Sequence, residues 1–196
     1  DVMPGPEDSF TAYGVGWANV SNTPFRGYKH DGYEGGISTP FLVHWPKAVP
    51  VESRNSIRSD PSHLIDIMPT FLAAAGATDR YPTEIDGQAI QPMEGVNLLP
   101  VLKGESLRRT APLCFEHHGN LAMRHGRWKI VSAFRNQQPT RWELYDMELD
   151  RTELSDLSEK NPERKQAMVR QWQAWADRVG VQPWPIQRPP RAGKKR

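Results

Sequence analysis

The stretch that most restricts how this chain can fold is NTPFRGYKHDGYEGGISTPFLVHWP, residues 22–46. Its first half places glycines around a single lysine, Lys29, and glycine tolerates both positive φ values and very close backbone contacts. Its second half contains a short apolar run, FLV, that begins directly after a proline. A continuous apolar run bounded by prolines predicts a strand over residues 39–45 that is covered on both faces, as in a parallel α/β sheet.

Lys29 is the first candidate for chemistry, because it stands five residues before a Glu34-Gly35-Gly36 turn. Glycine-rich backbone is used around bound anions, where converging N–H groups meet the negative charge. Ordinary turns are also rich in glycine, and a lysine in such a turn is commonly solvated. The local pattern therefore leaves an anion-contacting lysine and a solvated lysine both open.

The segment IDIMPTFLAAAG, residues 65–76, predicts a helix. Asp66 suits the N-cap, Pro69 falls in the first turn, where its missing N–H has no cost, and Gly76 suits the position just past the end. The predicted helix has one apolar face, made of Met68, Phe71, Leu72 and Ala75.

From residue 112 onward the segments LCFEHH, LAMRHGRWKIVSAF and RWELYDM are short, β-rich and separated by turn residues. This alternation predicts an antiparallel meander with a hairpin at His125-Gly126. A closing helix follows, with Asn161 as the cap, Pro162 at the first position and Gly180 at the end. Its apolar stripe at helical spacing predicts packing against the small sheet. The stripe consists of Met168, Trp172, Trp175 and Val179.

The second group of candidates is His117, His118 and Asn120, in the segment FEHHGN. They follow a predicted strand and surround a glycine, so their side chains could be presented at the end of the sheet. Adjacent histidines in a strand point to opposite faces, which makes them a poor pair of metal ligands. One packed and one solvated histidine is the plainer interpretation, and a substrate contact is the other.

Several common site types are missing from the sequence. It has no glycine-rich phosphate-binding signature, no G-x-S-x-G, no H-E-x-x-H and no cysteine spacing for zinc. No Asp-Asp or Asp-Asn pair offers a hard-cation site. The single cysteine, Cys114, permits no disulfide within the chain. No apolar run approaches the ~18 residues of a membrane span, so we expect no membrane partner.

The net charge is +2, but it is unevenly distributed. The tail RPPRAGKKR holds five of the 25 lysines and arginines and no acid, which leaves 20 basic residues against 23 acidic ones elsewhere. The body is therefore mildly acidic, and the short tail has nothing apolar to bury. We expect a disordered tail and no nucleic-acid partner.

Taken together, these segments resemble the C-terminal part of the type I sulfatases, the arylsulfatase family. The matching pieces occur in order over residues 10–185 and include GWANVSNTPFRGYKHDGYEGGISTPFLVHWP, HLIDIMPTFLAAAG, HGRWKIV and WELYDMELDRTELSDL. The spacing from Lys29 to the Glu-Gly-Gly turn is the most specific piece. Some family members have histidine where this chain has Tyr33.

The resemblance implies a sulfate-ester hydrolase of the alkaline-phosphatase-like α/β fold (α+β in this fragment). It implies that Lys29 contacts the sulfate group and the ester oxygen, and that His117, His118 and Asn120 could line the substrate mouth. The family nucleophile is a formylglycine made within a C-x-[PA]-x-R motif. The family metal is calcium, or magnesium, held by carboxylates and an amide.

Neither the nucleophile motif nor the metal-ligand motif occurs in this sequence. We therefore expect a C-terminal fragment that is inactive alone and holds no metal ligands of its own. Its expected partners are a sulfated small molecule or glycan and the remainder of the catalytic domain. The expected parts are the end of the catalytic domain (1–110, with 39–45 in its large mixed sheet), the small sheet and helix (111–185) and the basic tail (186–196).

Two other functions stay open at this point. A phosphodiesterase or phosphonate hydrolase of the same superfamily would need the same cation and anion-binding lysine. A non-catalytic glycan-binding module would use some of the seven tryptophans to stack on sugars. Tryptophans in a predicted small sheet and its helix are more commonly used for core packing.

Overall fold

The computed structural model describes residue 7 and residues 14–186, and these belong to two compact units. One unit lies within residues 1–40 and 112–196, and the other is formed by residues 41–111. The predicted basic tail lies outside the described residues from position 187 onward. None of the helices in the described part of the chain is long and apolar enough to cross a membrane.

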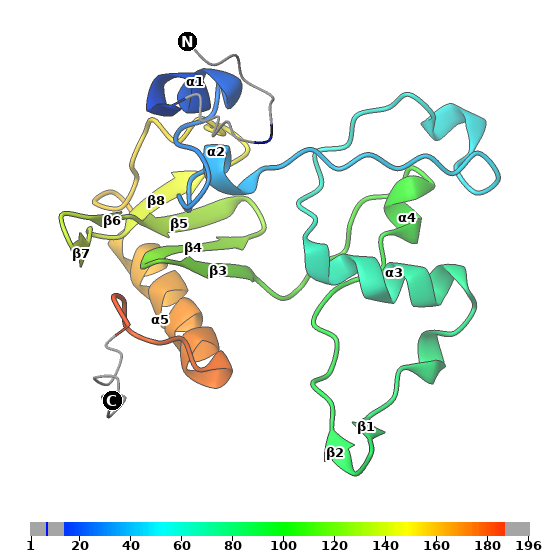
Figure 1. Ribbon diagram of the computed structural model, residues 1–196. Coiled ribbons are helices and arrows are strands. Elements are labelled where there is room, and N and C mark those ends of the chain that lie inside the picture. The colour runs from blue at the N-terminus through cyan, green and yellow to red at the C-terminus, as the bar shows by residue number, and fades with distance from the viewer. Residues whose placement is uncertain (1–6, 8–13, 187–196) are drawn as a thin grey trace. The chain divides into compact units, whose positions relative to one another are not determined.

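The first unit is built on a four-stranded antiparallel sheet with the strand order β3-β4-β5-β8 (Figure 1). The predicted meander is thereby confirmed. His125 pairs with Trp128, so Gly126 and Arg127 form the predicted hairpin loop. The strands are β3 (Leu113–His117), β4 (Asn120–His125), β5 (Trp128–Ser132) and β8 (Glu143–Asp146), beside a small ribbon of β6 (Phe134–Arg135) and β7 (Gln138–Pro139).

Helix α5 (Pro162–Val179) covers one face of this sheet (Figure 1). It begins after Asn161 and ends at Gly180, whose φ of 74° lies in the left-handed region, as predicted. Trp172 is buried, and its indole N–H donates to the backbone carbonyl of Phe115 at 3.2 Å. Trp175 lies half-buried at the edge of this cluster. The buried core on this face consists of Met123, Ile130, Leu144, Met168, Trp172 and Ala176.

The predicted helical stripe is confirmed in its first half and differs at its end. Met168 and Trp172 are buried, whereas Val179 is 46% exposed and Ala176 takes the last core position. The reason is geometric, because the last turn of an 18-residue helix extends beyond a narrow sheet of short strands. The helix therefore packs on the strands as far as Ala176, and Val179 lies beyond them.

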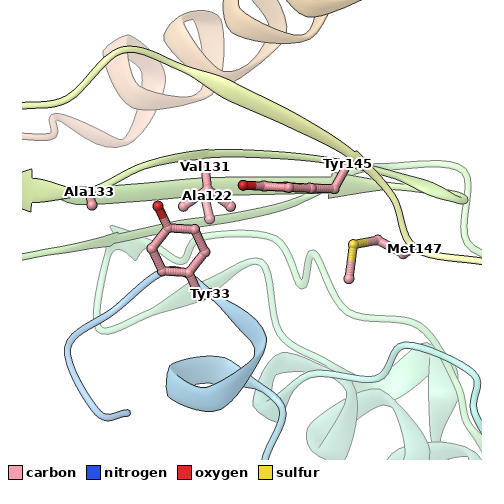
Figure 2. Packing of buried hydrophobic residues seen from close by; sticks show 6 residues of the cluster. All are labelled: Tyr33, Ala122, Val131, Ala133, Tyr145 and Met147. Atoms are coloured by element: carbon pink, nitrogen blue, oxygen red, sulfur yellow. The ribbon is translucent and has the colours of Figure 1, made fainter. Parts of the chain in front are cut away.

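The opposite face of the sheet is covered by the segment around helix α2 (Glu34–Ile37), as Figure 2 shows. Tyr33 lies against Ala122 and Val131, with Tyr145 alongside. Neighbouring residues of each strand point to opposite faces, and both faces of this sheet are apolar. The buried cluster on this side consists of Tyr33, Ala122, Val131, Ala133, Tyr145 and Met147.

These contacts group residues 14–40 with the small sheet, and the second unit comprises residues 41–111. The predicted parts 1–110, 111–185 and 186–196 stay predictions. The reason for the grouping is side-chain burial on the sheet by Tyr33 and Glu34, which sequence patterns do not reveal. Helix α1 (Gly14–Ser21) also precedes this segment and has no buried residue.

The second unit contains the predicted helix, as α3 (Ile67–Ala74), with Gly76 in the left-handed region at φ 64°. Asp66 occupies the N-cap position of α3, but its buried carboxylate accepts from the backbone N–H groups of His63 and Val96 and pairs with Arg109. The other elements are η1 (Val51–Ser53), η2 (Leu64–Asp66), η3 (Thr78–Arg80), β1 (Glu84–Ile85), β2 (Gln88–Ala89) and α4 (Leu99–Leu102).

The predicted strand over residues 39–45 was wrong for this structure. The segment is extended, but no strand of the described residues pairs with it, and Leu42 is 88% exposed. A strand needs neighbours for its backbone N–H and C=O groups, so an apolar run alone cannot form one. The predicted apolar face of α3 is likewise exposed at Met68 and Phe71, whereas Pro69 and Thr70 are buried.

The packing of α5 generates a stability prediction. Trp172→Ala should lower the free energy of unfolding of the sheet unit by about 3–5 kcal/mol, because it removes a buried aromatic group and leaves a cavity. The measurement is chemical denaturation followed by circular dichroism. Gln173→Ala, at the exposed neighbouring position, is the matched control and should change little. Equal midpoints for Trp172→Ala and the wild type would contradict the packing described above.

Candidate functional site

Residues 26–36, here called the lysine loop, are fixed to the sheet by a buried ion network. The ammonium of Lys129, on β5, is fully buried and lies 2.9 Å from the Glu34 carboxylate and 2.8 Å from the Glu153 carboxylate. Glu153 also accepts from the backbone N–H of Glu34 at 2.7 Å. One buried cation therefore links the end of the lysine loop, the central sheet and the segment that follows β8.

The two carboxylates of this network differ electrostatically. Burial opposes ionisation of Glu34, but the charges of Lys129, Arg124 and Arg151 outweigh burial and lower its pKa. Burial also raises the pKa of Glu153, and Lys129 offsets that effect only in part. Glu34 is therefore the carboxylate that holds its negative charge more firmly, and it stands at the base of the lysine loop.

The two glycines after Glu34 are required by steric exclusion. A β-carbon on Gly35 would lie 2.2 Å from the carbonyl oxygen of Gly27, and one on Gly36 would lie 2.1 Å from that of Asp31. Both distances are far inside van der Waals contact, so the backbone of the loop folds directly over the start of α2. The Gly35 N–H donates to the carbonyl of Arg26 at 2.9 Å and closes the loop.

Lys29 lies at the tip of this loop, in a turn closed by the Asp31 N–H donating to the carbonyl of Tyr28 at 3.0 Å. The Asp31 carboxylate pairs with Arg135, 2.5 Å away on β6, which ties the far side of the turn to the sheet unit. The Lys29 side chain is exposed and makes no salt bridge with any residue in the described part of the chain. The ammonium of Lys29 therefore pairs with no carboxylate of the described residues, and the backbone of its turn is held on both sides.

The residue after Lys29 brings the predicted site residues together. The His30 ring stacks on the His117 ring at 4.6 Å and on the His118 ring at 5.2 Å. His30 Nδ1 and His117 Nε2 are 2.5 Å apart, although the residues are 87 positions apart in the sequence. His30, His117 and His118, here called the histidine cluster, therefore lie directly beside Lys29 in the fold.

The expectation that His117 and His118 point to opposite faces was wrong. Their rings stack at a centroid distance of 4.2 Å. The reason is that β3 ends at His117, and His118 takes a left-handed conformation at φ 51°, which breaks the alternation of a strand. His30 itself was missed by sequence reasoning, because nothing local to it indicates a partner so distant in the chain.

Asn120 does not face solvent with the histidine cluster. It is buried, its amide NH₂ donates to the carbonyl of His117 at 3.1 Å, and its oxygen accepts from the Phe134 N–H at 2.9 Å. Because both ends of the amide are engaged, the structure gives Asn120 a positioning role in the turn that carries His118. That Asn120 lines the substrate mouth stays a prediction, and its amide is already engaged within the chain.

Tyr33, which stands where some family members have histidine, is part of the core. Its hydroxyl donates to Glu143 at 2.8 Å, and the Arg26 guanidinium lies 4.1 Å above its ring. Burial, followed by the Glu143 carboxylate, raises the pKa of Tyr33 and keeps the phenol neutral. This position therefore anchors the lysine loop by packing.

The histidine cluster does not fit the calcium ion that the family resemblance implies. Calcium prefers oxygen ligands, and the group of potential ligands gathered here consists of three imidazoles. Any calcium ligands would therefore have to be carboxylates and amides outside this cluster.

Comparison with known proteins identifies the family to which this chain is similar. The family described as N-sulphoglucosamine sulphohydrolase, C-terminal, matches residues 28–175, a range that includes Lys29 and the whole histidine cluster. The chain belongs to this family. A crystal structure of Ps i-CgsB in complex with k-i-k-neocarrahexaose is similar, with a TM-score of 0.61 and 32% identity over 79% of this chain and 32% of that one.

Sequence relatives agree with the family match. Mouse steryl-sulfatase is 34% identical over 58% of this chain and 16% of its own length, and the arylsulfatase of Klebsiella aerogenes is 31% identical over 56% and 23%. An uncharacterised sulfatase of Schizosaccharomyces pombe is 26% identical over 90% of this chain and 32% of its own. This chain therefore spans about a third or less of these relatives, and the predicted sulfatase resemblance and fold are confirmed.

The buried ion network supplies a second prediction. Lys129→Met should lower the free energy of unfolding by about 3–5 kcal/mol, because it leaves two buried carboxylates without their cation. Adding Glu153→Gln should recover part of the loss, since one of the stranded charges is then removed. Lys160→Met, at an exposed position, is the control. A Lys129→Met variant as stable as the wild type in denaturant titrations would show that the network is dispensable.

Proposed function

We propose that this chain forms the C-terminal part of a sulfatase catalytic unit and that Lys29 acts on the sulfate ester. The family match, which covers Lys29, supports the reaction class. The single observation that carries the role of Lys29 is its geometry: an exposed ammonium on a turn anchored by Asp31 on one side and Glu34 on the other.

The chemistry requires a cation at the ester oxygen. As the S–O bond breaks, negative charge grows on the departing oxygen, and a fixed positive group lowers the energy of that state more than it lowers the ground state. The backbone that carries Lys29 is restrained by Gly35, Gly36 and the Lys129 network, so only the lysine side chain has to be ordered. Lys29 would therefore steady the departing alkoxide or phenoxide.

The family nucleophile and calcium ion enter this proposal through the remainder of a longer polypeptide. When bound, a divalent cation supplies charge neutralisation at the sulfate oxygens. The residues of this chain would bind and orient the ester through Lys29 and the exposed imidazoles of the histidine cluster.

We propose a sulfated carbohydrate as the substrate class. The supporting observation is the similarity to Ps i-CgsB, whose crystal structure holds k-i-k-neocarrahexaose. In this chain the His118 ring stacks on Trp184 at 4.4 Å and on the ring of His30, the residue after Lys29, at 5.2 Å. Aromatic rings with a polar edge suit the apolar face and hydroxyl groups of a sugar. His117 and His118 are then the residues that contact the sugar carrying the sulfate.

Substitution of Lys29 tests its role in the complete enzyme. Lys29→Ala should lower kcat about 10²–10³-fold, the scale of losing one preorganised oxyanion donor. Lys29→Arg should restore little, because a planar guanidinium cannot replace a compact ammonium on a tight turn. The loss should shrink for esters with acidic leaving phenols, which need less help to depart.

The controls distinguish a catalytic Lys29 from a solvated lysine that takes no part in the reaction. Lys47→Ala, at another exposed lysine, should leave kcat unchanged, and neither variant should change the melting temperature. If Lys29→Ala retains a rate within about threefold of the wild type on an unactivated sulfate ester, Lys29 is a solvated loop residue. Faster turnover of a matched phosphodiester than of the sulfate ester would instead favour the phosphodiesterase alternative.

The chain alone should neither hydrolyse an aryl sulfate nor bind calcium tightly. The physical reason is that the sequence has no nucleophile motif and the described residues gather no cluster of oxygen ligands. Assays of the purified 196-residue chain, with and without calcium, make the measurement. Hydrolysis of the aryl sulfate that persists through repeated purification would contradict the proposal that the nucleophile and the calcium ligands lie outside this chain. Calcium-independent binding to a glycan array, without turnover by the complete enzyme, would favour a binding module.

A further inference from the structure

We propose that His30, His117 and His118 form a binding site for a divalent transition metal of the Zn²⁺ type, separate from the calcium chemistry of the family. Each residue offers one imidazole nitrogen, and these nitrogens all lie within 4.8 Å of one another. In a tetrahedral zinc site, Zn–N bonds of about 2.0–2.1 Å place ligand nitrogens roughly 3.3 Å apart. The rings are stacked, so these exposed side chains must turn for their nitrogens to converge on one ion at that spacing.

The chemistry of the ligands selects the metal. Imidazole suits zinc, copper and nickel, whereas calcium and magnesium prefer oxygen. Three histidines with the fourth position open to solvent make up the ligand number of a site that also holds a water or an anion. All three rings are exposed, so a metal can enter from solvent.

The three imidazoles are free of ion pairs within the part of the chain that the structure describes. Asp31 is itself paired with Arg135, and none of the salt bridges found in the described residues involves the three imidazoles. No ion pair therefore has to break when a metal ion binds, and only the His30–His117 contact has to open.

Both turns that carry the ligands are held by the fold. His30 sits in the Tyr28–Asp31 turn, which Arg135 ties down. On the other side, the buried amide of Asn120 donates to the His117 carbonyl, and the Gly119 N–H donates to Glu116 at 3.0 Å.

The imidazole ring of His118 is also held in place. Trp184 stacks on His118 and limits the directions in which that ring can turn. Preorganisation of this kind reduces the ordering needed when a metal binds, as in sites whose ligands are oriented by their surroundings. The support comes from three separate parts of the chain, which is the observation that distinguishes this cluster from histidines that meet by chance on a surface.

The test is a Zn²⁺ titration of the 196-residue chain, by calorimetry and by competition with a chromophoric chelator. The expected result is one tight site per chain that an excess of calcium does not displace. His30→Ala and His117→Ala should each weaken Zn²⁺ binding at least about tenfold, since loss of even an outer-shell partner has effects of that size. With Co²⁺ in place of Zn²⁺, the wild type should show the visible absorption of a tetrahedral site.

The control variant is His125→Ala, which changes a histidine at the far end of β4 from Asn120. It should bind Zn²⁺ as the wild type does, and circular dichroism should show that all variants are folded. Equal Zn²⁺ affinity in the wild type and in both cluster variants would overturn the proposal, as would no binding to the wild type. The metal site uses the imidazoles that the proposed function assigns to the sugar, but the Lys29 experiments do not depend on it, so the role of Lys29 and the metal site can fail independently.

Discussion

The buried ammonium of Lys129 is the interaction on which the candidate site depends. Its two carboxylate partners come from the lysine loop and from the segment after β8, so a single charge joins three parts of the chain. Buried ions are costly to desolvate unless they are paired, and in this network the two carboxylates lie 2.9 and 2.8 Å from the ammonium. Here that geometry fixes Glu34, and Glu34 stands five residues from the lysine that we assign to chemistry.

Features encoded by local signals were predictable from the sequence. The β4–β5 hairpin and the limits of α5 follow from Gly126, Asn161, Pro162 and Gly180, whose conformational preferences act on their immediate neighbours. Lys29 could be singled out because its spacing to the Glu-Gly-Gly turn resembles a family pattern. The fold class followed from the same resemblance.

Features that need partners far away in the chain could not be predicted. The run at 39–45 has the composition of a buried strand, yet composition supplies no neighbour to pair with. The contact of His30 with His117 joins residues 87 positions apart, and only the folded sheet brings them together. Asn120 looked like a surface ligand beside two histidines, but its short amide is the right length to close the turn from inside.

The glycine pair after Glu34 has a consequence for how this region tolerates change. Gly35 and Gly36 have no β-carbon, and the carbonyl oxygens of Gly27 and Asp31 lie where one would be. A saturation mutagenesis map scored by catalytic output would therefore rank these two positions with Lys29, although they carry no side chain. The loop backbone and the start of α2 can vary only together, so an exchange of the lysine loop between relatives must carry residues 26–36 as one block.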